Sequence, residues 1–221
     1  MFDDKNIVAT ILKKPGAMLI LQQVNEKLKE EKQRRQEFYE SITEEDKAEF
    51  INGEIVYHSP VVKEHNDATG HLYKLIHTYV GLLKLGYVGI EKILTRFTRN
   101  DYEPDICYFN LEKSKGFKKG QMFFPVPDLA VEVLSKSKKA IKRDTETKFE
   151  DYELHGVSEY WLIDPREETV EQHVLKEGKY RLVMKSGEGT LHSYAITGFS
   201  IPVRAIFDEE ANLAALRELL K

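Results

Sequence analysis

The chain has 221 residues, of which 41% are hydrophobic and 32% are charged, and its formal net charge is −4. This length is enough for one well-packed domain with an appendage, and the single cysteine, Cys107, excludes an internal disulfide framework. The acidic balance argues against a general nucleic-acid coat protein but allows a local basic site. No apolar run approaches the roughly 20 residues of a membrane span, and the first residues lack a secretory-signal pattern, so we expect a cytoplasmic protein.

Residues 15–40 are predicted to form one helix that begins at Pro15 and Gly16. Its apolar residues form only a thin stripe among many charges, and such a helix usually packs at a domain edge or against a partner chain. We therefore interpret the charged run 27–40 as a solvated face. Residues 37–54 hold seven acids and one base, which disfavours direct contact with phosphate groups.

The Asn52–Gly53 dipeptide lies between apolar residues and predicts a strand pair over residues 50–57. A helix is predicted over residues 64–85, where apolar residues recur at helical spacing, and Gly86 ends it. His65 lies on the same stripe, so it is expected to point to the core or to a site at the edge of the core. A hydrogen-bonded packing role is the more ordinary interpretation of this histidine.

Residues 87–109 are predicted to form two or three strands, the last of which includes Pro104 and Asp105. A loop over residues 112–127 follows. Residues 112–148 hold ten bases and five acids, so this part of the chain is locally basic, in contrast to the acidic N-terminal third.

Two apolar strands are predicted over residues 128–134 and 159–164, with a basic helix between them. The chain after Pro165 is predicted to form a β meander, and residues 209–221 a short amphipathic helix. The three meander strands are expected over residues 170–175, 180–184 and 191–196.

Glu132 is a carboxylate in the middle of an otherwise apolar strand. Burying an unpaired charge costs several kcal/mol or more, so Glu132 is expected to be neutralised, paired or bound to a cation. Asp105 stands at the start of another apolar strand. If the two strands are neighbours, the carboxylates form a pair of oxygen ligands suited to Mg²⁺, an ion that activates water and polarises phosphoryl groups.

Phosphoryl chemistry also requires a cation near the nucleophile or the developing charge. A lysine two residues after Glu132 would share its strand face, but that position is Leu134. Lys148 is the alternative, because Asp144, Lys148 and Tyr152 follow at four-residue spacing and lie on one helix face. An ordinary Asp–Lys pair within a helix explains the same spacing equally well, and both interpretations stay open.

These residues occur in an order that resembles a known family. The series consists of Asn52–Gly53–Glu54, Ser59–Pro60, His65, Pro104–Asp105, residues 131–135, Asp144, Lys148, Tyr152 and residues 156–165. Together they resemble the Uma2 family of restriction-endonuclease-like proteins, which belongs to the PD-(D/E)XK nuclease superfamily. The similarity covers roughly residues 48–207, and the segments 131–135 and 156–165 are specific in combination.

The resemblance implies an α/β (α+β) fold with a restriction-endonuclease-like core, in which helices flank a mixed central sheet. An extra N-terminal helix and a C-terminal β meander complete it. The expected divisions are an N-terminal helical extension (1–47), the nuclease domain (48–207) and a C-terminal helix (208–221). The resemblance also implies a homodimer.

The resemblance further implies a Mg²⁺ ion, for which Mn²⁺ can substitute, held by Asp105 and Glu132. The implied catalytic residues are these two acids, Lys148 and Glu54, where Glu54 completes the site from the first hairpin. The accessory residues are His65, Asp144 and Tyr152. Leu134 departs from the superfamily pattern, as is usual in this family, and leaves the role of Lys148 less defined than those of the acids.

The preferred interpretation is a Mg²⁺-dependent endonuclease that hydrolyses DNA phosphodiester bonds. The basic residues expected to contact phosphates are Lys118, Lys119, Lys138, Lys139, Lys142 and Arg143. Two other interpretations remain open. A nuclease-like fold retained as a non-catalytic nucleic-acid- or protein-binding module would take up no metal, and a metal-dependent hydrolase of small phosphoesters would be almost insensitive to salt, unlike DNA binding.

Overall fold

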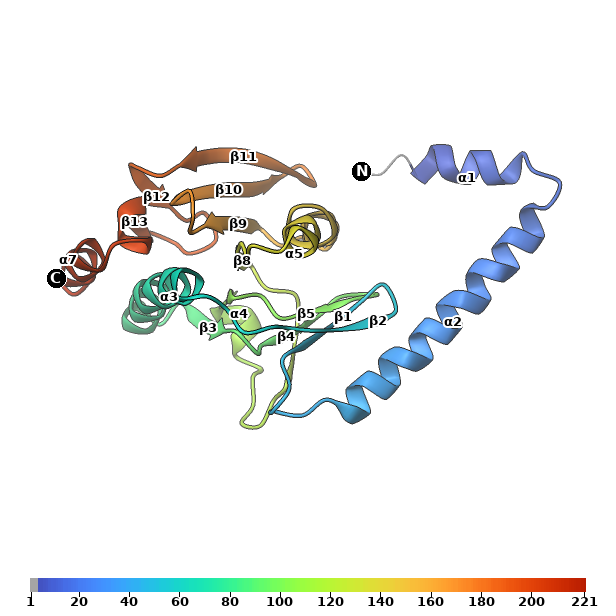
Figure 1. Ribbon diagram of the computed structural model, residues 1–221, viewed down its shortest axis with the longest axis horizontal. Helices are drawn as coiled ribbons and strands as arrows, with labels where there is room; N and C mark the ends of the chain where they lie inside the picture. The colour runs from blue at the N-terminus through green and yellow to red at the C-terminus, as the bar shows by residue number, and fades with distance from the viewer. Residues whose placement is uncertain (1–3) are drawn as a thin grey trace.

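Two mixed β-sheets, the helices that pack on them and a long helical arm make up this computed structural model, which describes residues 4–221 (Figure 1). The predicted mixed α+β class is therefore confirmed. Residues 1–3 of the expected N-terminal extension lie outside the described residues. Within residues 4–221, no helix is long and apolar enough to cross a membrane.

The larger sheet has six strands in the order β11-β10-β9-β8-β6-β3. Its strands are β3 (Gly86–Ile90), β6 (Ile106–Asn110), β8 (Leu129–Val133), β9 (Glu159–Asp164), β10 (Thr169–Lys176) and β11 (Lys179–Ser186). The neighbours β8 and β9 are parallel and all other pairs are antiparallel. A parallel pair needs a crossover connection, which the segment with Lys148 provides. All five residues of β8 are buried, so β8 is a central strand.

The smaller sheet has five strands in the order β2-β1-β5-β4-β7. These are β1 (Ala48–Ile51), β2 (Glu54–Tyr57), β4 (Leu94–Arg96), β5 (Asp101–Tyr102) and β7 (Phe123–Phe124). The predicted hairpin is confirmed, since β1 and β2 pair antiparallel around a turn in which Asn52 and Gly53 both have positive φ. Positive φ at both turn positions matches the twist of hairpin strands and favours Asn-Gly.

The helices are α1 (Asp4–Leu12), α2 (Ala17–Ser41), α3 (Lys63–Leu83), α4 (Leu111–Ser114), α5 (Lys138–Lys142), the π-helix η1 (Arg143–Lys148), α6 (Phe149–Leu154), the 3-10 helix η2 (Val203–Ile206) and α7 (Glu209–Leu219). The predicted helices over 15–40, 64–85 and 209–221 correspond to α2, α3 and α7. The single basic helix that was expected after β8 is instead three consecutive segments, α5, η1 and α6.

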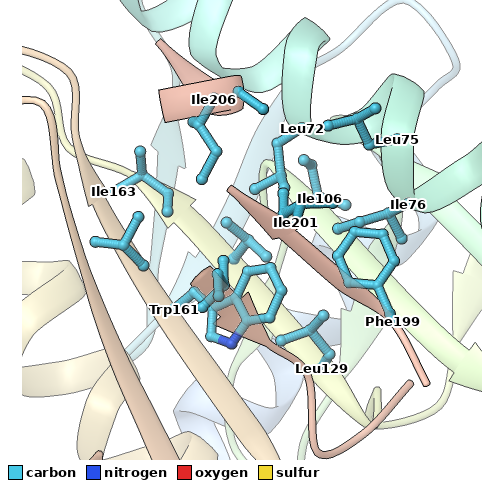
Figure 2. Packing of buried hydrophobic residues seen from close by; sticks show 14 of the residues in the cluster. Leu72, Leu75, Ile76, Ile106, Leu129, Trp161, Ile163, Phe199, Ile201 and Ile206 are labelled. Atoms are coloured by element: carbon cyan, nitrogen blue, oxygen red, sulfur yellow. The ribbon is translucent and has the colours of Figure 1, made fainter. Parts of the chain in front are cut away.

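Helix α3 and the C-terminal segment cover one face of the larger sheet. Figure 2 shows Leu72, Leu75 and Ile76 of α3 packed with residues of β6, β8 and β9 and of the C-terminal segment, namely Ile106, Leu129, Trp161, Ile163, Phe199, Ile201 and Ile206. The opposite face carries a second cluster that includes Tyr102, Tyr152 and Tyr160. This second, more polar layer contains the candidate site.

The third meander strand is shorter than predicted because a buried carboxylate holds the following loop. Strands β12 (Thr190–His192) and β13 (Ser200–Pro202) pair with each other, and residues 193–196 are not a strand. Glu159 Oε2 accepts hydrogen bonds from Ser193 Oγ and from two main-chain N–H groups of the loop, at 2.7 to 3.0 Å. Its Oε1 accepts from Trp161 Nε1 and Gln172 Nε2.

Replacing Glu159 with Ala is expected to destabilise the fold by about 3 kcal/mol or more, because several buried donors lose their acceptor at once. Urea unfolding followed by tryptophan fluorescence measures this change, since Trp161 is a direct partner. The control Glu167→Ala removes an exposed carboxylate and should change the free energy of unfolding by less than about 0.5 kcal/mol. Equal effects of the two substitutions would contradict the role given to Glu159.

Candidate functional site

Strands β6 and β8 bring Asp105 and Glu132 together. The strands pair antiparallel with Ile106 opposite Val131, so the next pair outward is Asp105 and Glu132, on one face of the sheet. Both are buried, with 8% and 4% of their surface exposed. The main-chain N–H of Val133 donates to Asp105 Oδ2 over 2.7 Å. The two apolar strands at which Asp105 and Glu132 stand are therefore neighbours.

Lys148 brings a positive charge to this face from the segment that follows β8. Its Nζ lies 2.9 Å from Glu132 Oε1, 2.8 Å from Glu49 Oε1 and 3.5 Å from Asp144 Oδ1. Its side chain is only 1% exposed. Burial lowers the pKa of Lys148, but the three carboxylates outweigh burial and hold this pKa above its ordinary value. Lys148 is therefore a buried cation at neutral pH.

A π-helical turn places Lys148 over the sheet. The turn η1 spans Arg143–Lys148 between two short α-helices, and single π turns within helices are frequent at functional sites. Tyr160 of β9 fixes this turn, because its hydroxyl donates to the carbonyl oxygen of Asp144 over 2.9 Å. Asp144 and Lys148 share one side of the segment, as their spacing predicted, although through a π turn.

Tyr152 and Lys148 meet at one oxygen of Glu132. The Tyr152 hydroxyl donates to Glu132 Oε1 over 2.9 Å, the oxygen that also contacts Lys148. Burial raises the pKa of Glu132, and the nearby carboxylates of Asp144 and Asp105 raise it further against the opposing effect of Lys148, so the net pKa lies well above the ordinary value. Glu132 thus keeps a proton to a higher pH than an exposed glutamate does.

Glu49 is a site residue that the sequence analysis missed. It is fully buried in β1, and its Oε1 accepts from Lys148 and from the main-chain N–H of Glu103 over 3.0 Å. Its Oε2 lies 3.2 Å from His58 Nε2 and 3.7 Å from Arg143 Nε. Burial raises the pKa of Glu49, but Lys148 and His58 outweigh burial and hold the pKa far below its usual range.

Glu54, the hairpin acid that the sequence analysis chose, does not reach this cluster. It is exposed on β2 opposite Ile51, and its side chain makes no ion pair with the part of the chain that the structure describes. The signal that identified Glu132, a carboxylate inside an apolar strand, also applies to Glu49, which precedes Phe50 and Ile51. The acidic residues before β1 obscured that signal.

His65 lies beside Asp105 at the first turn of α3. Its Nε2 is 3.4 Å from Asp105 Oδ2, and its side chain is buried. Burial lowers the pKa of His65, but the hydrogen bond and the charge of Asp105 outweigh burial and raise it. The pKa of Asp105 is lowered, because its contacts with His65 and the Val133 N–H outweigh its burial. His65 therefore holds Asp105 in its ionised form.

The predicted phosphate-binding residues fall into two groups. Lys138, Lys139 and Lys142 are exposed on α5, directly after the strand that carries Glu132. Lys118 and Lys119 are exposed in the loop between α4 and β7. Arg143 is placed differently from the expectation, since it is mostly buried and lies 3.7 Å from Glu49 and 3.9 Å from Asp144. Arg143 thus belongs to the carboxylate cluster.

The donor set of Asp105 and Glu132 fits a Mg²⁺ ion. Within residues 4–221, Asp105 Oδ1 and Glu132 Oε2 accept no hydrogen bond, so each carboxylate keeps a ligand atom while its other oxygen is held. No group of three or more His, Cys, Asp or Glu side chains in the described part of the chain forms a metal cage. Mg²⁺ commonly binds through one or two carboxylates and retains several waters, which suits this pair.

Comparisons with known proteins identify the family and support the fold. The Uma2 family model, described as "Putative restriction endonuclease", matches residues 35–204. A crystal structure of a putative nuclease belonging to DUF820, from Anabaena variabilis ATCC 29413, has 19% sequence identity and a TM-score of 0.63, and covers 78% of this chain and 96% of that chain. This likeness supports the fold. The search of curated proteins found no match.

Replacing His65 with Gln is expected to destabilise the protein in a pH-dependent way. Because the pKa of His65 is raised in the fold, the contribution of its charge is fully present below the unfolded value of about 6.5 and is lost as pH rises through the folded value. Because the pKa of Asp105 is lowered, its contribution is present above about pH 4 and is lost as pH falls through its folded value.

The difference in free energy of unfolding between wild type and His65→Gln should therefore be largest between about pH 4.5 and 6 and decline above about pH 7. Urea unfolding at a series of pH values measures it. His77→Gln, on the same helix but exposed, is the matched control and should show no such profile. A difference that is constant from about pH 5 to 8 would contradict the charged His65–Asp105 contact.

Proposed function

Because the chain belongs to the Uma2 family, whose model is described as "Putative restriction endonuclease", we propose that it is a Mg²⁺-dependent endonuclease that hydrolyses DNA phosphodiester bonds. The observation that carries this proposal is the buried pair of Asp105 and Glu132 on adjacent strands, with Lys148 2.9 Å from Glu132. Two carboxylates with free oxygens and a fixed ammonium group form the minimal set for metal-assisted phosphoryl chemistry.

Asp105 and Glu132 would hold the Mg²⁺ ion, and Mn²⁺ is the proposed substitute. When bound, such an ion would supply Lewis-acid polarisation of a phosphoryl oxygen and a water of lowered pKa. His65 keeps Asp105 ionised, and Tyr152 fixes Glu132 through one oxygen while the other stays free. These two neighbours therefore orient the proposed ligands before the ion arrives.

Lys148 contributes fixed positive charge. A lysine whose pKa is raised stays protonated and does not act as a general base at neutral pH. Because its side chain is 1% exposed, its charge acts through Glu132 without direct contact with a bulky substrate. Preorganised charge of this kind stabilises the charge that develops in the transition state. Glu49 and Asp144 hold the ammonium group in place.

The exposed lysines of α5 are proposed to contact DNA phosphates. They follow β8 directly, so they lie near the end of the strand that carries Glu132. The position of the mostly buried Arg143 near Glu49 and Asp144 instead suits a structural role. The loop with Lys118 and Lys119 provides a second group of exposed charges.

Cleavage of supercoiled plasmid with Mg²⁺, Mn²⁺ or EDTA tests the proposed activity. We expect Asp105→Asn and Glu132→Gln each to reduce the cleavage rate by about 100-fold or more, because each removes charge at the reacting centre. Glu49→Gln should also reduce the rate, since it removes one of the three carboxylates that compensate the buried charge of Lys148. Glu54→Gln is the matched control and should leave the rate unchanged.

Calorimetric titration with Mn²⁺ provides a readout that does not depend on cleavage. Wild type and Glu54→Gln should bind the ion, and Asp105→Asn should not. Cleavage that is equal in wild type and Asp105→Asn would show a contaminating nuclease. A wild type that neither binds Mn²⁺ nor cuts plasmid would overturn the proposal in favour of a non-catalytic binding module.

Replacing Lys138 and Lys139 with Ala is expected to weaken duplex DNA binding and to reduce the slope of log affinity against log salt by about 2, since each phosphate contact contributes about 0.9. Fluorescence anisotropy with labelled duplex at several salt concentrations, in Ca²⁺ to prevent turnover, measures both quantities. Lys176→Ala with Arg181→Ala removes the same charge from β10 and β11 and should leave the slope unchanged. Equal effects of the two double variants would contradict a DNA contact specific to α5.

A further inference from the structure

Helix α2 has an anchored half and an unsupported half. In the anchored half, Arg35 donates to both carboxylate oxygens of Asp101 at 2.6 Å, and Arg99 donates to both oxygens of Glu31 at 2.7 and 2.8 Å. Residues 21–30, in contrast, are all exposed. Figure 1 shows α1 and the first half of α2 standing apart from the sheets.

One stripe of α2 runs through both halves. It consists of residues spaced alternately three and four apart, which are Leu21, Val24, Leu28, Glu31, Arg35 and Phe38. The last three all contact the rest of the chain or are buried against it. The first three are 44–51% exposed. A seam with this spacing is the one along which helices pair in coiled coils, and its first half has no partner within residues 4–221.

Helix α1 also exposes apolar side chains. Ile7, Val8 and Leu12 are 54–72% exposed, and α1 joins α2 through a short turn. An isolated helix of about 14 residues is marginal in water, and contiguous exposed apolar surface marks an interaction site. The arm thus requires a partner that covers apolar surface. The family model begins at residue 35, so this segment lies outside the nuclease domain.

The charge pattern identifies a second copy of this chain as the partner. Residues 15–25 contain no charged side chain, so an acidic or basic partner finds no opposite charge there. In a two-fold interface the same surface meets itself, and a stripe without charge avoids repulsion between like groups. Asn25 borders the stripe, and amide side chains both donate and accept hydrogen bonds. Such amides can pair reciprocally across a two-fold axis.

We propose that α1 and residues 17–30 of α2 form a homodimer interface in which the apolar stripes of two copies pack against each other. The stripe continues the seam that already holds α2 on its own body, so pairing extends an existing packing surface. This inference does not rest on the proposed nuclease activity, since no residue of the carboxylate cluster takes part in it.

Sedimentation velocity of the full chain over about 1 to 100 µM tests the interface, because association depends on concentration. We expect the wild type to be a dimer. Leu21→Glu places a charge on the stripe. It should raise the dissociation constant of the dimer at least ~10-fold, equivalent to about 1.4 kcal/mol. Gln23→Glu adds the same charge two residues away on the opposite face of the helix and should leave the dimer intact. Thermal unfolding confirms that both variants remain folded.

Three outcomes would overturn the proposal. The first is a wild type that is monomeric at the highest concentration. The second is a dimer that Leu21→Glu and Gln23→Glu weaken equally, which places the interface elsewhere. The third is a monomer that floats with neutral phosphatidylcholine vesicles, which identifies the stripe as a membrane-binding surface.

Discussion

The burial of the Lys148 ammonium group constrains the rest of the site. Moving a charge out of water costs several kcal/mol even after relaxation, and this cost is offset only because three carboxylates lie within 3.5 Å of Nζ. They come from different elements: Glu49 from the smaller sheet, Glu132 from the larger sheet and Asp144 from the π turn. Lys148 therefore connects the two sheets and the crossover segment. Because all three carboxylates contact the same ammonium group, the position of each is coupled to the positions of the other two.

The sequence identified part of this cluster for a sound physical reason. Glu132 was predicted because a charge inside an apolar strand needs a partner, and the structure provides Lys148 and Tyr152 as those partners. Glu49 satisfies the same criterion but follows an acidic run, so its strand did not stand out. The hairpin was predicted, but which of its acids is buried depends on which sheet β1 joins. That pairing, with Phe50 opposite Asp101, is a long-range contact that local pattern does not encode.

Segment boundaries were less predictable than the segments themselves, because tertiary contacts set them. Four-residue spacing suggested a regular helix through Lys148, whereas the structure has a π turn that Tyr160 fixes through the carbonyl of Asp144. The third meander strand ends early because Glu159 binds the loop after it. In both cases a side chain from β9 determines the backbone of another segment. Residue periodicity in the sequence indicates which face of a helix or strand a residue occupies. It does not indicate tertiary contacts of this kind.

The carboxylates of the site fall into two electrostatic classes, one with a lowered pKa and one with a raised pKa. Burial raises the pKa of Glu49, yet Lys148 and its other basic neighbours hold it far below the usual range, so Glu49 serves as the counterion of Lys148. Glu132 has a raised pKa, which means that Lys148 alone does not neutralise the remaining negative charge. A metal ligand must be deprotonated, so the proposed divalent cation would have to compete with a proton at Glu132. Under the proposed function, Asp105, which His65 keeps ionised, would face no such competition, and this difference would make Asp105 the stronger of the two proposed ligands.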